Sequence, residues 1–336
     1  MVGSSQYGDG MRFGAFVPQG WRLDLVGVDR DRHWQVMSGV ASTIEGSGFE
    51  SLWVYDHFHT VPVATQEVTY EAWTLMGALA VSTETVRLGQ MCTCNSYRPP
   101  AYLAKVAASI DVLSGGRLEM GIGAGWYEHE YLGYGYSFDK ASVRIGRLRE
   151  AVEIMQRMWT EDEVFYDGTH YSLQGAICQP KPVQDPHIPI WVAGGGEQLT
   201  LNVAARHASY TNFGNSLDEF RHKSDVLRGH CEDVGTDFEA ITRSSNFNII
   251  CGETEAEVEE QIDRYRNTMV ELVGEKKGNE TADQYREMSG TPEQIVQKLR
   301  PWADAGMTYA IVYFPMMAQD TTGLGRFGAE VIPALT

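Results

Sequence analysis

The sequence predicts a parallel (β/α)8 barrel, and three observations favour this fold class. Eight short apolar runs alternate with longer stretches of helical period between residues 11 and 336. The apolar runs are nearly continuous, which is typical of parallel strands buried on both faces. An open, doubly wound sheet is the competing architecture. It usually carries a glycine fingerprint after its first strand, and Val17-Pro18-Gln19-Gly20-Trp21 does not supply one.

The first half of the chain contains four strand–helix pairs. In the third helix, Leu103, Ala107 and Ile110 share one face, and Gly115 and Gly116 follow as a left-handed stop where glycine carries no Cβ penalty. The expected strands cover residues 12–17, 52–55, 86–92 and 118–122, and the expected helices cover 34–44, 72–81, 100–113 and 145–159.

The second half contains four more strands and two insertions. Thr291 and Pro292 open a helix as N-cap and first helical residue. A segment over 160–186 is expected to form a short hairpin around Asp167-Gly168, and the polar segment 274–289 is expected to be a mobile insertion. The barrel therefore has insertions after strand 4 and before strand 8. The expected strands cover 188–193, 209–212, 241–251 and 309–314, and the expected helices cover 199–207, 217–234, 254–272, a stretch from 292 and 321–335.

Composition indicates a protein that handles small molecules. The formal net charge is −18 over 336 residues, with 43% hydrophobic residues. This charge argues against a nucleic-acid or anionic-membrane partner, which needs a clustered basic face. No apolar run is long enough to span a membrane. Residues 1–10 are expected to be a flexible leader and 11–336 a single domain. The five scattered cysteines favour reduced thiols and a cytoplasmic location.

In a barrel, the loops after the strands build the active site. His57 follows the second strand and is a candidate acid/base, because an unperturbed histidine titrates at about 6.5. A structural histidine is the plain alternative. The pair His57-x-His59 also suggests a zinc site, because two histidines at a strand end can hold zinc. The other strand ends offer no further set of ligands, so a metallohydrolase is disfavoured. Cys92 and Cys94 are interpreted as packing residues.

Glycine-rich loops follow the fourth and fifth strands. The first, Gly121-Ile122-Gly123-Ala124-Gly125-Trp126, is a weak signal for close approach of a flat ligand. The second, Gly194-Gly195-Gly196, leads into a helix and presents bare backbone N–H groups that suit a phosphate, with a plain loop as the alternative.

The order of these motifs resembles the bacterial luciferase-like monooxygenase superfamily, and within it the coenzyme F420-dependent oxidoreductases. The resemblance runs from about Met11 to the last helix and implies barrel enzymes that are commonly homodimers. The motifs that carry it are Tyr55-Asp56-His57-Phe58, Tyr97-Arg98-x-Pro100-x-x-Leu103-Ala104-Lys105, Asp111-x-Leu113-Ser114-Gly115-Gly116-Arg117 and Gly121-Ile122-Gly123-Ala124-Gly125-Trp126.

The resemblance implies a role for each matching residue. His57 matches a histidine that moves a proton to or from substrate while a hydride moves to or from C5 of the deazaflavin. Asp56 matches a residue that lines the cofactor ring. The bulge behind the ring, where such enzymes often carry a non-proline cis peptide, matches Met91, Cys92 and Thr93. The loop that holds the cofactor phosphate matches Gly194, Gly195 and Gly196.

One matched position departs from the family pattern. Trp126 stands at the cofactor ring where the sugar-phosphate-oxidising branch carries a glutamate, which favours an apolar or aromatic substrate. The acidic tail of F420 calls for basic residues, and Arg98 is one candidate. The alternative is an FMN-dependent two-component monooxygenase supplied by a separate reductase. A cofactor-storage relative is a third reading, which the retained His57 argues against.

Overall fold

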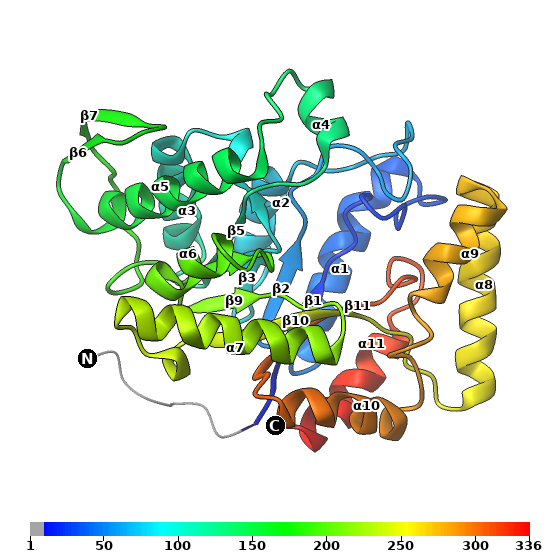
Figure 1. The fold of residues 1–336 in the computed structure, drawn as a ribbon. Helices are drawn as coiled ribbons and strands as arrows, with labels where there is room; N and C mark the ends of the chain where they lie inside the picture. The colour runs from blue at the N-terminus through cyan, green and yellow to red at the C-terminus, as the bar shows by residue number, and fades with distance from the viewer. Residues whose placement is uncertain (1–9) are drawn as a thin grey trace. The chain divides into compact units, whose positions relative to one another are not determined.

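The computed structural model describes residues 10–336, so the predicted leader lies outside the described residues except for Gly10. Within this range the main sheet has the strand order β3-β2-β1-β11-β10-β9-β8-β5-β4 (Figure 1). An additional pairing of β3 with β5 closes the sheet, which confirms the predicted (β/α)8 barrel. The strands of this sheet are β1 (Arg12–Phe16), β2 (Ser51–Val54), β3 (Arg87–Gln90), β4 (Thr93–Cys94), β5 (Leu118–Gly123), β8 (Ile190–Ala193), β9 (Tyr210–Asn212), β10 (Thr242–Asn248) and β11 (Tyr309–Tyr313).

The α-helices alternate with these strands along the chain. They are α1 (His33–Gly46), α2 (Ala72–Ser82), α3 (Pro100–Leu113), α4 (Glu128–Gly133), α5 (Ala141–Thr160), α6 (Thr200–His207), α7 (Leu217–Val234), α8 (Glu255–Val273), α9 (Glu275–Asp283), α10 (Pro292–Asp304) and α11 (Thr322–Arg326). Among residues 10–336, none of the helices combines the length and the apolarity needed to cross a membrane.

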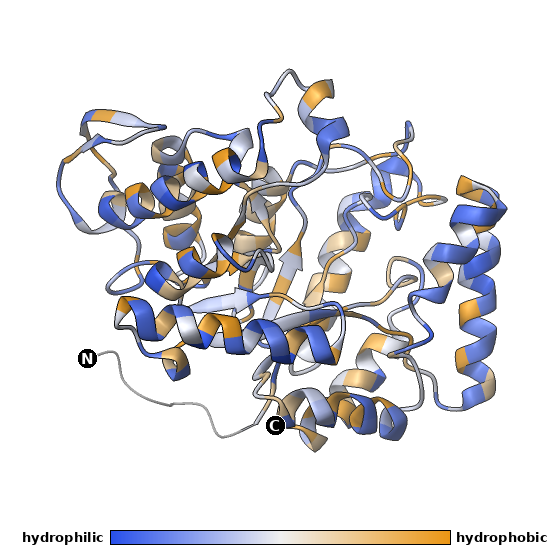
Figure 2. Ribbon diagram, viewed as in Figure 1, coloured by the Kyte–Doolittle hydropathy of each residue, from blue (hydrophilic) through white to orange (hydrophobic). Residues whose placement is uncertain are grey.

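The chain divides into two compact units. The terminal unit comprises residues up to 52, 60–68 and 243–336, and the central unit comprises 53–59 and 69–242. In the terminal unit β11 pairs in parallel with both β1 and β10. Phe327 anchors its core, with ring centroids 5.4 Å from Phe13 and 5.7 Å from Phe314. Helices α8 and α9 pack together and are largely hydrophilic in Figure 2.

In the central unit the parallel pairs are β3–β5, β5–β8 and β8–β9. Trp53 and Trp191 meet edge to face at 4.7 Å, and Trp191 stacks on Tyr210 at 4.2 Å. A Cβ at Gly89 would overlap the Trp53 ring, so the indole occupies space that only glycine leaves open. The predicted hairpin around Asp167-Gly168 is present as the antiparallel pair β6 (Val164–Asp167) and β7 (Ser172–Ala176).

Two predicted helix ends are confirmed. Thr291 caps α10 through a capping box with Gln294. Gly115 and Gly116 follow α3 with φ of 69° and 87°.

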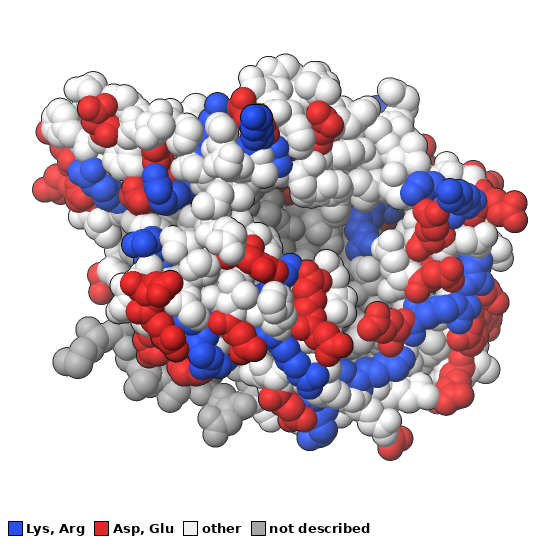
Figure 3. Space-filling view, in the orientation of Figure 1, with Lys and Arg blue, Asp and Glu red and all other residues white. Residues whose placement is uncertain are grey.

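On the face shown in Figure 3, acidic and basic side chains are interspersed.

Several element boundaries differ from the sequence prediction. The segment 274–289, expected to be a mobile insertion, contains α9, because Gly278 lets this helix approach the backbone of Val270 in α8. The third strand ends at Gln90, before a cis Met91–Cys92 peptide. The last helix is α-helical only to Arg326 and continues as a π-helix and a 3-10 turn over 327–334, where a proline without an N–H donor precedes the end.

Candidate active site

His57 and Glu130 form the polar centre of the central unit. His57 follows β2 at its carboxyl end, and Glu130 lies in α4 with its side chain fully buried. The Nδ1 atom of His57 is 2.8 Å from Oε2 of Glu130. The other oxygen, Oε1, accepts the backbone N–H groups of Phe58 at 2.7 Å and His59 at 2.8 Å. Tyr97 donates its hydroxyl to Oε2 at 2.9 Å. Glu130 therefore ties the segment 57–59 to α4.

These contacts lower the pKa of Glu130. Burial alone raises the pKa of this carboxyl group, because it penalises the charged form. The hydrogen bond and charge of His57, together with the N–H groups of His59 and Phe58, outweigh burial and bring the pKa below its ordinary value. Glu130 is therefore a carboxylate at neutral pH.

Asp56 and Arg98 form a second buried pair. Asp56 Oδ2 accepts from Arg98 Nη1 at 2.7 Å and from the N–H of Cys94 at 2.8 Å, and Oδ1 accepts from Nη2 at 2.9 Å. Arg98 also donates to Glu71 at 2.5 Å. Burial lowers the pKa of Arg98, but the charges and hydrogen bonds of Asp56 and Glu71 together outweigh burial, and the pKa is raised. Arg98, named above as a candidate for the acidic tail of F420, is thus held between two carboxylates.

The bulge after β3 is largely buried, with Cys92 half-buried, and its thiols have raised pKa values. Burial and the neighbouring charges of Cys94 and Asp56 raise the pKa of Cys92 to about 12. Cys94 is similarly raised to about 12 by burial. Thr93 is fully buried and donates its hydroxyl to Gln90 at 2.7 Å. Met91 is buried as well, and none of the five cysteines, all of which lie within residues 10–336, forms a disulfide, which agrees with the packing interpretation of the thiols.

Aromatic rings form a wall beside His57. Trp126 is 62% exposed, stacks on Tyr127 with centroids 5.1 Å apart, and meets the His57 ring at 5.7 Å. Gly125, at φ 79°, turns the chain into this segment, and a Cβ there would overlap the Tyr131 hydroxyl. A solvent-exposed indole next to an imidazole offers an apolar surface to a flat ligand.

The triple-glycine loop joins β8 to α6. A Cβ at Gly195 would overlap the ammonium of Lys223, and one at Gly196 would lie 2.8 Å from the Thr200 hydroxyl. Lys223 comes from α7 and pairs with Glu219 one turn earlier. The N–H of Gly194 donates to the carbonyl of Asn212 at 3.0 Å. The loop thus combines the backbone of Gly195 and Gly196 with an ammonium and a hydroxyl, a donor set that fits a phosphate group.

Metal ligation gains no support from the histidines. His57 contacts Glu130, whereas His59 Nδ1 lies 2.9 Å from Nδ1 of His129. Within residues 10–336, no group of three or more histidine, cysteine, aspartate or glutamate side chains is arranged to hold a metal ion.

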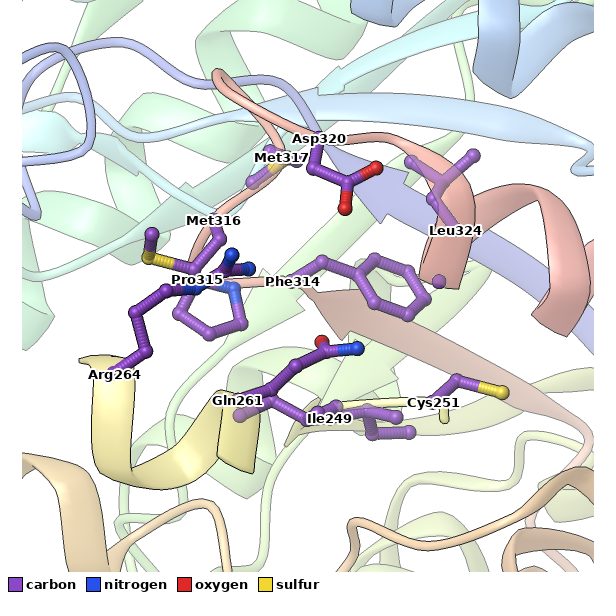
Figure 4. Close-up of a pocket in the computed structure, with 12 residues that line it drawn as sticks. Ile249, Cys251, Gln261, Arg264, Phe314, Pro315, Met316, Met317, Asp320 and Leu324 are labelled. Atoms are coloured by element: carbon purple, nitrogen blue, oxygen red, sulfur yellow. The ribbon is translucent and has the colours of Figure 1, made fainter. Parts of the chain in front are cut away.

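The terminal unit contains a hollow of about 330 Å³, open solvent at its mouth included. Figure 4 shows Phe314, Met316 and Leu324 on its apolar side, with Arg264 and Asp320 as the charged residues. None of the candidate cofactor or catalytic residues lies in its lining.

Two residues of the central unit escaped the sequence analysis. Lys223 had no signal, because it follows the glycine loop by 27 residues and reaches it only through the packing of α6 against α7. The sequence places Glu130 beside Glu128 in an acidic segment after the fourth strand, at the expected mouth of the barrel, but its spacing from His57 gives no hint that the two meet.

The comparison with family models identifies one family. A family model described as luciferase-like monooxygenase matches residues 11–309. The F420-dependent glucose-6-phosphate dehydrogenase of Kineococcus radiotolerans is 27% identical over 322 residues, covering 89% of this chain and 92% of the relative.

Two solved structures are similar over nearly the whole chain. An F420-dependent secondary alcohol dehydrogenase in complex with an F420-acetone adduct has a TM-score of 0.79 at 20% identity, covering 97% of this chain and 99% of its own. A monooxygenase from Streptomyces bottropensis has a TM-score of 0.79 at 19% identity, covering 97% and 100%. At these identities the likeness shows the fold alone.

Proposed function

The chain belongs to the luciferase-like monooxygenase family, and from this premise we propose that it is an F420-dependent oxidoreductase. In this proposal a hydride moves between the cofactor and a small apolar or aromatic organic substrate, and His57 gives or takes the proton. The observation that carries the proposal is the position of His57, at a strand end, fixed by Glu130 and facing the exposed ring of Trp126. The Kineococcus radiotolerans relative, described as F420-dependent, favours F420 over FMN.

The central unit contains residues that suit each part of the cofactor. When bound, F420 supplies or accepts the hydride at C5 of its deazaflavin ring. Gly195 and Gly196 would hold the phosphate with backbone N–H groups, and the ammonium of Lys223 would neutralise part of its charge. Gly194 would serve the phosphate by close backbone approach, because its own N–H donates to the carbonyl of Asn212 at 3.0 Å. The residues assigned to the ring in this proposal are Asp56, Met91, Cys92, Thr93 and Trp126. Trp126 is exposed and Cys92 is half-buried, so these two would contact the ring, whereas the buried Asp56, Met91 and Thr93 would support it from behind.

His57 moves the proton that balances the hydride. In the reducing direction the substrate gains a hydride and a proton, and the proton leaves the imidazolium of His57. In the oxidising direction the proton returns to the imidazole. A positioned acid/base of this kind contributes about 10²- to 10⁴-fold to the rate. Glu130, as a carboxylate, stabilises the imidazolium form.

Trp126 sets the proposed substrate class. Its indole is exposed beside His57 and carries no charge, so apart from its single N–H donor it offers dispersion and ring stacking instead of the several hydrogen bonds that sugar hydroxyls need. A flat apolar or aromatic carbonyl compound, or the corresponding alcohol, fits such a wall best.

The alternative remains an FMN-dependent monooxygenase whose reduced flavin comes from a separate reductase. FMN has a ribityl-phosphate arm, as F420 does, so the same phosphate loop would suit it.

We further propose that the protein is a cytoplasmic homodimer, as the family resemblance and the composition predict.

Turnover assays test the proposed function. Reduced F420 is incubated with the protein and a panel of aromatic aldehydes and ketones, and oxidised F420 with the matching alcohols, while the deazaflavin absorbance is followed. The matched control is His57→Asn, because the Asn amide can still donate to Glu130 but has no counterpart of Nε2. We expect His57→Asn to lower kcat by about 10²- to 10⁴-fold. Wild-type turnover in this variant would remove His57 as the proton donor.

A further inference from the structure

The carboxylate of Glu130 is surrounded by hydrogen-bond donors of two kinds. Its Oε1 atom accepts two backbone N–H groups, from Phe58 and His59. Backbone N–H groups only donate, so this oxygen must be an acceptor. Its Oε2 atom faces Nδ1 of His57 at 2.8 Å and the hydroxyl of Tyr97 at 2.9 Å. The two oxygens therefore have different neighbours, and only Oε2 contacts a group with two possible tautomers.

The charge state of Glu130 selects between those tautomers. A carboxylate accepts hydrogen bonds and donates none, and the pKa of Glu130 is lowered, so the group is ionised at neutral pH. An Nδ1 lone pair directed at Oε2 would bring two acceptors to 2.8 Å, which is repulsive. The neutral ring must then carry its proton on Nδ1, and the lone pair belongs to Nε2.

We propose that Glu130 is a positioning residue that holds neutral His57 in the tautomer protonated at Nδ1 and makes Nε2 the proton-transfer atom. This inference rests on the proposed function, since it names the atom of His57 that serves the reaction. For an alcohol substrate, the O–H proton goes to Nε2, the C–H hydride goes to oxidised F420, and a carbonyl compound leaves. The reverse reaction returns both.

Glu130→Gln inverts the tautomer without removing the contact. The amide oxygen of the glutamine has to take the place of Oε1, because the N–H groups of Phe58 and His59 need an acceptor there. The amide NH₂ then replaces Oε2 and donates toward Nδ1 of His57. The neutral imidazole then carries its proton on Nε2, so Nε2 can no longer accept a proton from the substrate.

The tautomer is measured directly by NMR. Protein labelled with ¹⁵N-histidine is examined in alkaline buffer by long-range ¹H–¹⁵N correlation, which distinguishes protonated from unprotonated ring nitrogens. The His57 signals are identified as those missing from His57→Asn. We expect the proton on Nδ1 in wild type and on Nε2 in Glu130→Gln. Tyr97→Phe is the matched control: it removes a donor to the same oxygen, and we expect the proton to stay on Nδ1.

Each outcome decides the inference. A wild-type His57 protonated at Nε2 overturns it without any variant, so the test survives if Glu130→Gln fails to fold. A Glu130→Gln protein that keeps the proton on Nδ1 also overturns it. In turnover, we expect Glu130→Gln to lower kcat by about 10²- to 10⁴-fold while the Kd for F420 stays within about threefold. A wild type with the expected tautomer that does not bind F420 would refute the proposed function and leave the tautomer assignment standing.

Discussion

Arg98→Met tests the buried ion pair that supports the strand-end loop. Asp56 is 1% exposed and Arg98 binds it through two parallel N–H···O contacts of 2.7 and 2.9 Å. Methionine keeps most of the side-chain volume but removes both donors and the positive charge. Among the described residues 10–336, Asp56 would then keep the N–H of Cys94, at 2.8 Å, as its remaining hydrogen-bond partner.

The expected cost follows from leaving a carboxylate buried without its counter-ion. Removing one partner of a buried pair costs about 3–5 kcal/mol, a large part of a typical unfolding free energy of roughly 5–15 kcal/mol. Asp56→Asn in the Arg98→Met background removes the unpaired charge, because the amide still accepts from Cys94 and adds no net charge. We expect the double variant to recover about half of the loss, which makes the two substitutions strongly non-additive.

Equilibrium urea denaturation measures these free energies, with circular dichroism and tryptophan fluorescence as two probes whose transitions should coincide. A loss below about 1 kcal/mol for Arg98→Met would refute the reasoning, since that is the range of exposed ion pairs. Unchanged stability with weakened F420 binding would instead return Arg98 to the role of a ligand for the acidic cofactor tail.

The remaining predictions concern the site and its titratable groups. Trp126→Ala should raise KM for aromatic substrates by about tenfold, corresponding to roughly 1.4 kcal/mol of stacking and burial, with kcat changed less; steady-state kinetics on an aromatic and an aliphatic substrate checks this. Lys223→Met should weaken F420 binding by about 10- to 100-fold, the value of a charge-assisted hydrogen bond, and a fluorescence titration against the exposed-lysine control Lys276→Met measures it. The thiols of Cys92 and Cys94, with pKa values raised to about 12, should resist iodoacetamide in the native protein at pH 8, and mass spectrometry of native and urea-treated samples would expose any error. Because its pKa is lowered on folding, Glu130 stabilises the protein above the ordinary glutamate pKa and loses this contribution as pH falls through its lower folded value; Glu130→Gln should flatten the acid limb of stability against pH, and an unchanged limb would contradict the assignment.

Strand-end chemistry was accessible from sequence, whereas contacts between elements were not. His57 could be placed because a short apolar run ending before it indicates a strand, and barrel strands deliver their carboxyl ends to one face. Glu130 could not be paired with His57, since that contact depends on how α4 packs back over the segment 57–59. Lys223 was missed for the same reason.

The local sequence pattern also gave wrong predictions for the burial of one side chain and for the structure of one polar segment. The helical period over 34–44 predicts one buried stripe of Trp34, Met37, Ala41 and Ile44. The structure buries the last three in α1, but Trp34 is 41% exposed. The periodicity of a helix indicates the direction of its apolar face, but the elements that pack against the helix determine how wide a part of this face is buried. The polar segment 274–289 shows the converse, because α9 is a helix through its packing on α8 despite its weak apolar pattern.

The most direct test of the central proposal is a titration of the purified protein with F420 and with FMN, following quenching of cofactor fluorescence. We expect F420 to bind at least about tenfold more tightly than FMN, a difference of roughly 1.4 kcal/mol or more. Lys223→Met should weaken that binding, while a charge-neutral surface variant should not. A preference for FMN would replace the proposal with a two-component monooxygenase, and binding of neither cofactor would contradict it.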